Sequence, residues 1–188
     1  MPALSSLDQI SSKRIRELDK WWHEAGSIGA PPARDSFDPA QFRLLLPYLV
    51  LSEVVAPFRV RYRLIGTEVA DTSGFNFVGR YLDELVAPGD EENWEARYRQ
   101  CFDSAGPVYG INRVATVLDK VLEYPYGIWP LRTKDRDVGQ FIAVEDYGNR
   151  YSLLRQWYRA PLQNWRLQLP TSAPAPHVAS QQALLLQE

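Results

Sequence analysis

The chain has 188 residues, of which 45% are hydrophobic and 23% charged, which suits one globular domain with extensions and argues against global disorder. Its 21 basic and 23 acidic residues give a net charge of −2, which lacks the basic excess that is typical of nucleic-acid-binding proteins. The sequence starts without an apolar signal segment and no apolar run approaches the roughly 20 residues that span a bilayer, so we expect a cytoplasmic protein with no membrane or nucleic-acid partner.

The first 46 residues predict an N-terminal helical extension. Residues 6–25 repeat apolar side chains at helical spacing, behind a capping box that starts at Ser6. After a linker with Gly and Pro, Asp38 and Pro39 predict the N-cap and first residue of a short helix that ends near Leu46. The amphipathic first helix would either cover a sheet face or pair with a second copy, and from the second alternative we expect a homodimer.

Two strands follow at 48–55 and 58–65, and only Ala56 and Pro57 separate them, which predicts a hairpin. The second strand alternates, with Val60, Tyr62 and Leu64 on one face and Arg59, Arg61 and Arg63 on the other. Two interpretations of the arginine face stay open. Either carboxylates such as Glu53 pair with the arginines across the strands, or the arginines dock an acidic partner.

Residues 66–104 predict several short helices broken by glycine and proline, the longest of them near 90–104. Trp94, Tyr98 and either Cys101 or Phe102 share one stripe of that helix.

Three strand-like runs at 108–118, 121–132 and 138–147 follow with short polar connections, as in an antiparallel meander. The order predicts an α+β fold with one five-stranded antiparallel sheet and a helical insert between the second and third strands. We expect an extension at 1–46, a core at 47–147, a C-terminal helical extension at 148–169 and a mobile tail at 170–188.

Four segments carry a resemblance to a known family. They are Asp38-Pro39 with Leu-Leu-Pro-Tyr-Leu at 45–49, Tyr-Arg-Leu-Ile-Gly-Thr at 62–67, Phe-Val-Gly-Arg-Tyr-Leu-Asp-Glu-Leu at 77–85, and Glu123 followed by Trp129-Pro130-Leu131. In this order they resemble PAS_5, a bacterial single-domain PAS family typical of alphaproteobacteria. The resemblance implies the PAS fold and a role in signal sensing or protein–protein regulation, and it supplies no shared catalytic residues.

A PAS architecture would place a ligand pocket between the inner sheet face and the helical insert. The residues that we expect to line it are Tyr62, Trp94, Tyr98, Phe102, Arg113 and Trp129. The partner would be a small organic ligand, a signalling protein, or both. A packed core without a cavity is the open alternative, because aromatic side chains suit both.

Catalytic and cofactor motifs are scarce in the sequence. Two histidines, His23 and His177, cannot form a multi-histidine metal site in the core, and the chain has no phosphate-binding glycine loop. The cysteine segment of flavin-adduct PAS domains does not occur, and Cys101 is the one internal candidate for a haem ligand. We therefore expect no enzyme activity, no metal and no cofactor. The alternatives are a cone-shaped α+β enzyme with a polar dyad in its pocket, and a ligand-free adaptor.

Overall fold

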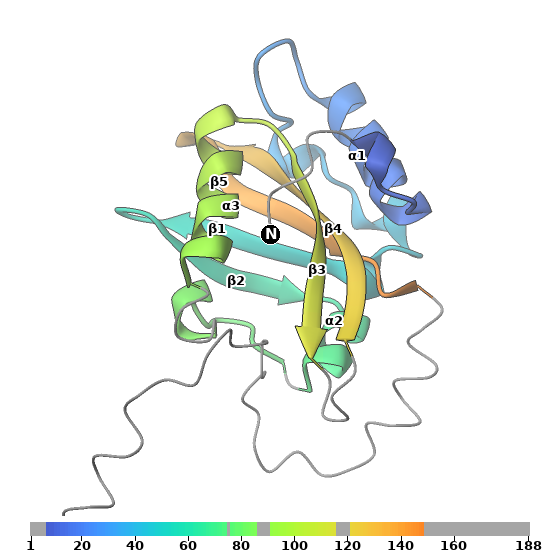
Figure 1. The fold of residues 1–188 in the computed structure, drawn as a ribbon. Coiled ribbons are helices and arrows are strands. Elements are labelled where there is room, and N and C mark those ends of the chain that lie inside the picture. Colours follow the sequence, from blue (N-terminus) through green and yellow to red (C-terminus); the bar gives the residue numbers. More distant parts are fainter. Residues whose placement is uncertain (1–6, 75, 86–90, 116–120, 149–188) are drawn as a thin grey trace, which may run out of the picture.

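In a computed structural model of the chain, residues 7–74, 76–85, 91–115 and 121–148 are described (Figure 1). One antiparallel sheet has the strand order β2-β1-β5-β4-β3, so the first and last strands pair at its centre. The strands are β1 (Leu49–Val55), β2 (Arg59–Ile65), β3 (Val108–Ala115), β4 (Val121–Thr133) and β5 (Arg136–Glu145). The predicted α+β class, with five antiparallel strands and an insert between the second and third, is confirmed.

Three α-helices and five short 3-10 helices surround the sheet in the described residues. The α-helices are α1 (Lys13–Ala25), α2 (Thr67–Ser73) and α3 (Glu91–Ser104). The 3-10 helices are η1 (Leu7–Gln9), η2 (Arg34–Ser36), η3 (Pro39–Phe42), η4 (Leu46–Tyr48) and η5 (Leu82–Glu84).

The N-terminal helices differ from the prediction in their bounds. The first begins at Lys13, because the Ser12 hydroxyl accepts a hydrogen bond from the Ile15 amide at 3.1 Å and caps it. The predicted cap at Ser6 lies outside the described residues. Asp38 caps the second predicted helix, but that helix is the 3-10 helix η3, which ends at Phe42 rather than near Leu46. Apart from Gly148, the predicted C-terminal helix at 148–169 and tail at 170–188 also lie outside the described residues.

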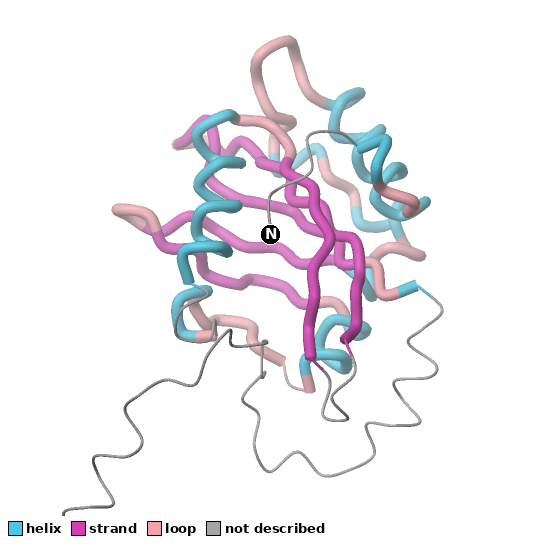
Figure 2. Tube along the Cα trace, viewed as in Figure 1, coloured by secondary structure: helices cyan, strands magenta, loops and turns pink. Residues whose placement is uncertain are grey.

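Helices cover both faces of the sheet (Figures 1 and 2). We call the face under α2 and α3 the inner face and the face under α1 the outer face. Buried apolar strand side chains of the inner face are Val50, Val54, Val60, Tyr62, Val108, Tyr124, Tyr126, Ile128, Val138, Phe141 and Ala143. Those of the outer face are Leu49, Leu51, Tyr109, Trp129, Leu131, Ile142 and Val144. The core therefore consists of two layers with the sheet between them.

The predicted hairpin of β1 and β2 is present, and it contains a register shift. Leu51 lies opposite Leu64 but Ser52 lies opposite Tyr62, so Arg63 is an extra residue in β2. A bulge reverses the alternation of side chains beyond it. Leu64 is consequently 41% exposed, and its predicted inward position is wrong, whereas Val60 and Tyr62 do point inward.

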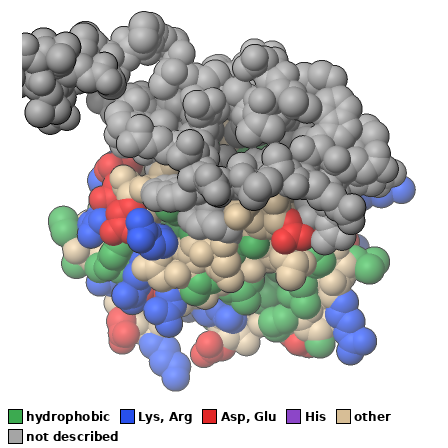
Figure 3. All heavy atoms as spheres, turned by 90° about the horizontal axis from the view of Figure 1, so that it is seen from below, with side chains coloured by type: hydrophobic (Ala, Val, Ile, Leu, Met, Phe, Trp, Pro, Cys, Tyr) green, Lys and Arg blue, Asp and Glu red, His purple; other side chains and the backbone are tan. Residues whose placement is uncertain are grey.

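The arginines of β2 are paired with carboxylates. Glu53 on β1 accepts a hydrogen bond from Arg61 Nε at 2.7 Å and lies 3.5 Å from Arg63 Nε. Arg59 pairs with Asp83 of the insert at 2.8 Å. Of the two interpretations left open, cross-strand pairing is the one observed for Arg61 and Arg63. In the view from below, basic and acidic side chains lie beside one another on the coloured part of the surface (Figure 3).

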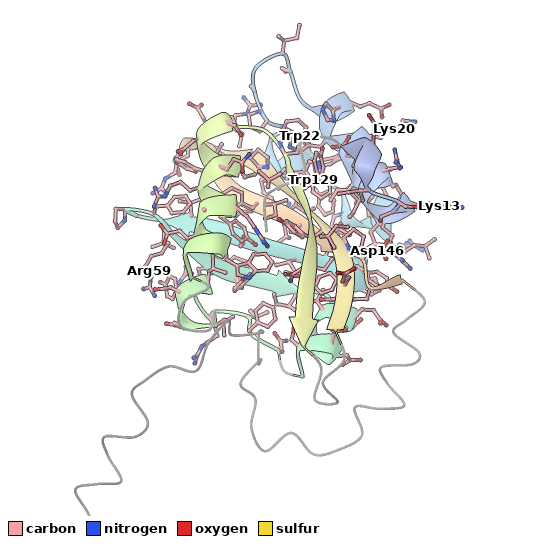
Figure 4. All side chains as sticks on the ribbon, in the orientation of Figure 1. Lys13, Lys20, Trp22, Arg59, Trp129 and Asp146 are labelled. Carbon is pink, nitrogen blue, oxygen red and sulfur yellow. The ribbon has the colours of Figure 1, made fainter. Side chains whose placement is uncertain are left out.

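Helix α1 is held on the outer face by a buried carboxylate. Asp19 accepts hydrogen bonds from the Trp129 indole at 2.9 Å and from the Tyr109 hydroxyl. Trp22 of α1 donates its indole N–H to the Pro130 carbonyl at 2.7 Å, and Figure 4 shows Trp22 near Trp129. The amphipathic helix therefore covers the sheet, which is one of its two predicted roles.

Candidate ligand site between the sheet and the insert

Four of the six predicted ligand residues lie in one cluster between the inner face and the insert. Tyr62 comes from β2 and Tyr98 from α3, and they are only 8% and 3% exposed. Trp94 and Phe102 lie one turn to either side of Tyr98 and are half-buried. The Trp94 ring packs against Tyr126 with 5.7 Å between ring centroids. The aromatic stripe of the helix thus faces the sheet, as its spacing predicts.

The other two predicted ligand residues are not in this cluster. Trp129 is fully buried on the outer face, where its indole bonds to Asp19, so its predicted place beside the insert is wrong. Strand β4 carries apolar side chains on both faces and shows no alternation from which the inward side could be deduced. Arg113 belongs to β3, but its side chain lies outside the described part of the chain, and its ligand role stays a prediction.

A carboxyl group lies among tyrosines at one end of the inner face. Glu145 ends β5, and its carboxylate accepts a hydrogen bond from the Tyr147 hydroxyl. The Tyr124 hydroxyl also bonds to Glu145 and accepts a 2.7 Å hydrogen bond from Asn112 Nδ2. The Tyr124 and Tyr147 rings meet edge to face with 4.6 Å between centroids. We call Glu145, Tyr124, Tyr147 and Asn112 the tyrosine–glutamate cluster.

A second polar group lies on the same face. The hydroxyls of Tyr62 and Tyr98 are hydrogen-bond neighbours, which brings β2 and α3 together. Ser52 on β1 is 1% exposed, and its hydroxyl lies next to that of Tyr98. The hydroxyls of Ser52, Tyr62 and Tyr98 thus lie together within the apolar inner layer.

Burial sets the protonation states of these groups. It raises the pKa of Glu145, while the hydroxyls of Tyr147 and Tyr124 act in the opposite direction by donating hydrogen bonds. Burial also raises the pKa of Tyr62, Tyr98, Tyr124 and Tyr147, with the Glu145 charge as a smaller contribution. The tyrosines therefore remain protonated near neutral pH and present hydroxyl donors to the interior.

The raised pKa of Glu145 predicts a pH-dependent stability. The folded protein keeps this proton to a higher pH than the unfolded chain, so its contribution is fully present below the unfolded pKa and is lost as pH rises through the folded pKa. Glu145→Gln cannot ionise, so we expect it to reduce the pH dependence of the unfolding free energy between these two pKa values. Urea unfolding from about pH 4 to pH 8 measures this dependence. The exposed Glu24→Gln is the control, and an unchanged pH profile in Glu145→Gln would contradict the assignment.

The surroundings of Glu145 also bear on the enzyme alternative. The hydrogen-bond partners found for its carboxylate are tyrosine hydroxyls rather than a basic side chain. His23 lies on α1 at the outer face, where its ring bonds to the Asp19 carbonyl. Among the described residues, no group of three or more His, Cys, Asp or Glu could hold a metal ion. Among the described residues, the groups that bond to this carboxylate are therefore phenolic, and the enzyme alternative stays an open prediction.

Two charged residues of the inner layer were not predicted from the sequence, Glu145 and Arg97. Each carried a signal. Glu145 alternates with Phe141 and Ala143 along β5, and alternate strand residues share a face. Arg97 follows Trp94 by three residues and therefore lies on its helical stripe. Charged side chains are rarely buried unless paired, which favours a surface assignment for both from sequence.

Comparisons with known proteins agree with the architecture. The family model described as a PAS domain, PAS_5, matches residues 10–144. No curated protein matches the chain. None of the described helices is long and apolar enough to cross a membrane.

Several solved structures are similar to this chain. One is the LOV protein of Rhodobacter sphaeroides, with 14% identity, 63% of this chain and 74% of that chain covered, and a TM-score of 0.43. Another is the dark structure of the blue-light photoreceptor Aureochrome1 LOV, with 11% identity, coverage of 65% and 92%, and a TM-score of 0.45. A third is the PAS domain of a protein from Colwellia psychrerythraea, with 11% identity, coverage of 57% and 93%, and a TM-score of 0.43. Similarity at this level carries no information about ligands.

Proposed function

Because the chain belongs to the PAS domain family, we propose that it is a sensory signalling module that binds a small organic ligand between the inner face and the insert. The observation that carries this proposal is the polarity of that layer. Tyrosine hydroxyls from β2, β4 and α3, the Glu145 carboxyl and the Ser52 hydroxyl all lie there. Ligand sites combine apolar walls with a few convergent polar groups, and this layer has both.

A covalent flavin adduct does not fit the cysteine of this chain. Cys101 is fully buried on α3, and its Sγ lies 3.6 Å from the Ile128 carbonyl of the sheet. Burial raises the pKa of the thiol well above its usual range, which disfavours the nucleophilic thiolate. Cys101 therefore acts as a small apolar residue of the core, and we propose a ligand that is held without a covalent bond.

The signal of ligand binding passes to α1 through the end of β5. There the consecutive residues Glu145 and Asp146 face opposite layers. Glu145 lies in the tyrosine–glutamate cluster. Asp146 accepts hydrogen bonds from Ser12 Oγ at 2.5 Å and from Arg14 Nη1 at 2.6 Å, at the start of α1 (Figure 4). A ligand that moves Glu145 therefore also displaces Asp146, and this changes how firmly α1 is docked.

We expect Asp146→Ala to loosen α1 without unfolding the sheet. The substitution removes two short hydrogen bonds to a carboxylate that is 9% exposed, at a cost of about 2 kcal/mol. Amide hydrogen exchange within 13–25 should accelerate roughly 30-fold, whereas β5 should keep its protection. The exposed Asp35→Ala is the control, and uniform acceleration across α1 and the sheet would mean that α1 has no separate opening.

The ligand proposal is tested on the purified protein. Native mass spectrometry detects copurified small molecules, and thermal-shift measurements with a panel of small organic compounds detect added ones. A bound ligand should shift the indole N–H resonance of Trp94 and leave that of Trp129, which lies on the outer face, nearly unchanged. A ligand that perturbs only Trp129, or the absence of any ligand, would contradict the proposal. The predicted homodimer stays a prediction that the same native spectra examine.

A further inference from the structure

Arg97 lies in the layer between α3 and the inner face, and it is only 8% exposed. Its guanidinium carbon lies 4.5 Å from the Trp94 ring centroid and 5.0 Å from that of Tyr126. The Tyr126 ring lies over Gly110 of β3, and a Cβ added to Gly110 would lie 2.6 Å from carbons of that ring. The cation is therefore enclosed by one ring from α3 and one from the sheet.

The Arg97 guanidinium has no counter-charge in the described part of the chain. Its Nη1 is fully buried and makes no hydrogen bond, and no ion pair recorded there includes Arg97. Arg99, two residues further along the same helix, is exposed and pairs with Glu95 at 2.7 Å. Of these two arginines of α3, the one with less access to water is thus the one without an anion.

A buried arginine in this state is unfavourable. A guanidinium does not lose its proton in proteins, so it cannot escape desolvation by becoming neutral. The two aromatic faces offset part of the cost through cation–π attraction. They do not satisfy the N–H donors, which form a planar fork that matches the two oxygens of a carboxylate or phosphate.

We propose that Arg97 binds the anionic group, a carboxylate or a phosphate, of the small organic ligand that this layer takes up. The inference rests on the proposed function and names the chemistry of its ligand. Trp94 and Tyr126 would pack against the apolar part of the ligand that follows this group. Tyr126 pairs with Glu145 in the β4–β5 register, and Tyr124 lies next along the same face. The opposite, neutral polar end of the ligand would therefore reach the tyrosine–glutamate cluster.

The test uses benzoate, succinate and inorganic phosphate as probes on the full chain at constant ionic strength, with benzamide as the uncharged counterpart of benzoate. We expect at least one anion to raise Tm by about 5 °C at concentrations near 100-fold its Kd, and benzamide to have little effect. Benzoate and succinate represent carboxylate ligands, and phosphate represents phosphorylated ones, so the responding probe identifies which group Arg97 takes.

Two variants of Arg97 and a matched control separate binding from folding. Arg97→Met keeps an unbranched side chain and should fold, because replacing an unpaired buried charge by an apolar group is often neutral or stabilising. It should bind the responding anion at least about tenfold more weakly than the unmodified protein, while Arg97→Lys should lose less of the affinity. Arg99→Gln, on the exposed side of the same helix, should bind as the unmodified protein does.

Each outcome decides the proposal. Loss of the anion response in Arg97→Met but not in Arg99→Gln supports it. Equal responses in both variants, or no response of the unmodified protein to any of the three anions, overturns it. If uncharged compounds stabilise the protein and shift the Trp94 resonance while anions do not, the anion site is wrong but the proposed function stands. If no compound binds at all, both proposals fail.

Discussion

Trp129→Ala should lower the free energy of unfolding by about 3–5 kcal/mol, although Trp129 touches no part of the proposed ligand site. The side chain is fully buried on the outer face and packs edge to face on Tyr109, with 5.8 Å between centroids. Its removal leaves a large cavity beneath α1 and takes one of two hydrogen bonds from the Asp19 carboxylate. Urea unfolding measured by far-UV circular dichroism gives the change.

Two further variants show what the effect depends on. Trp129→Phe keeps most of the ring but not the indole N–H, so it should lose a smaller part of the stability. Trp94→Ala removes a half-buried tryptophan of the inner layer and should cost less than about 2 kcal/mol while weakening ligand binding. If Trp129→Ala instead impaired binding at unchanged stability, the predicted place of Trp129 beside the insert would be right and the two-layer description would fail.

The contrast between the two tryptophans shows how far sequence patterns reach. The helical stripe through Trp94 and Tyr98 predicts correctly that both face the sheet, since a surface helix has one apolar side. Strand β4 has no polar side, because α1 covers one face and the insert the other. In such a strand, periodicity cannot assign Trp129 to one face of the sheet. Only the pairing of all five strands makes that assignment.

The order of elements and the hairpin were predictable because each depends on local signals. The bulge at Arg63 was not, since it depends on how β1 and β2 pair rather than on either sequence alone. The same limit applies to the candidate site. The aromatic residues of the helix follow from its spacing, whereas the meeting of Ser52, Tyr98 and Glu145 depends on the packing of α3 across the sheet.

Gly66 is where the sheet passes into the insert, and Gly66→Ala should lower the unfolding free energy by about 3 kcal/mol or more. Backbone freedom is not the reason for glycine here, because φ −64° and ψ 152° are allowed to any residue. Space is the actual constraint. A Cβ would lie 2.5 Å from the Leu46 carbonyl oxygen and closer still to the Pro47 carbonyl.

The groups that such a Cβ would meet are backbone, so no side-chain rotation can relieve the clash. The Gly66 amide donates to the Leu49 carbonyl at 2.7 Å, and its own carbonyl accepts from Ala70 at the start of α2, which fixes the segment from both sides. To relieve the clash, α2 would have to move away from η4. This movement would open the layer between the inner face and the insert, where we propose that the ligand binds. Gly106→Ala is the control, because the nearest atom to its Cβ would be Ser104 Oγ at an ordinary 3.5 Å. Thermal unfolding of the two variants should therefore differ by roughly 6–12 °C, and equal Tm values would show that the Leu46–Pro47 turn yields easily.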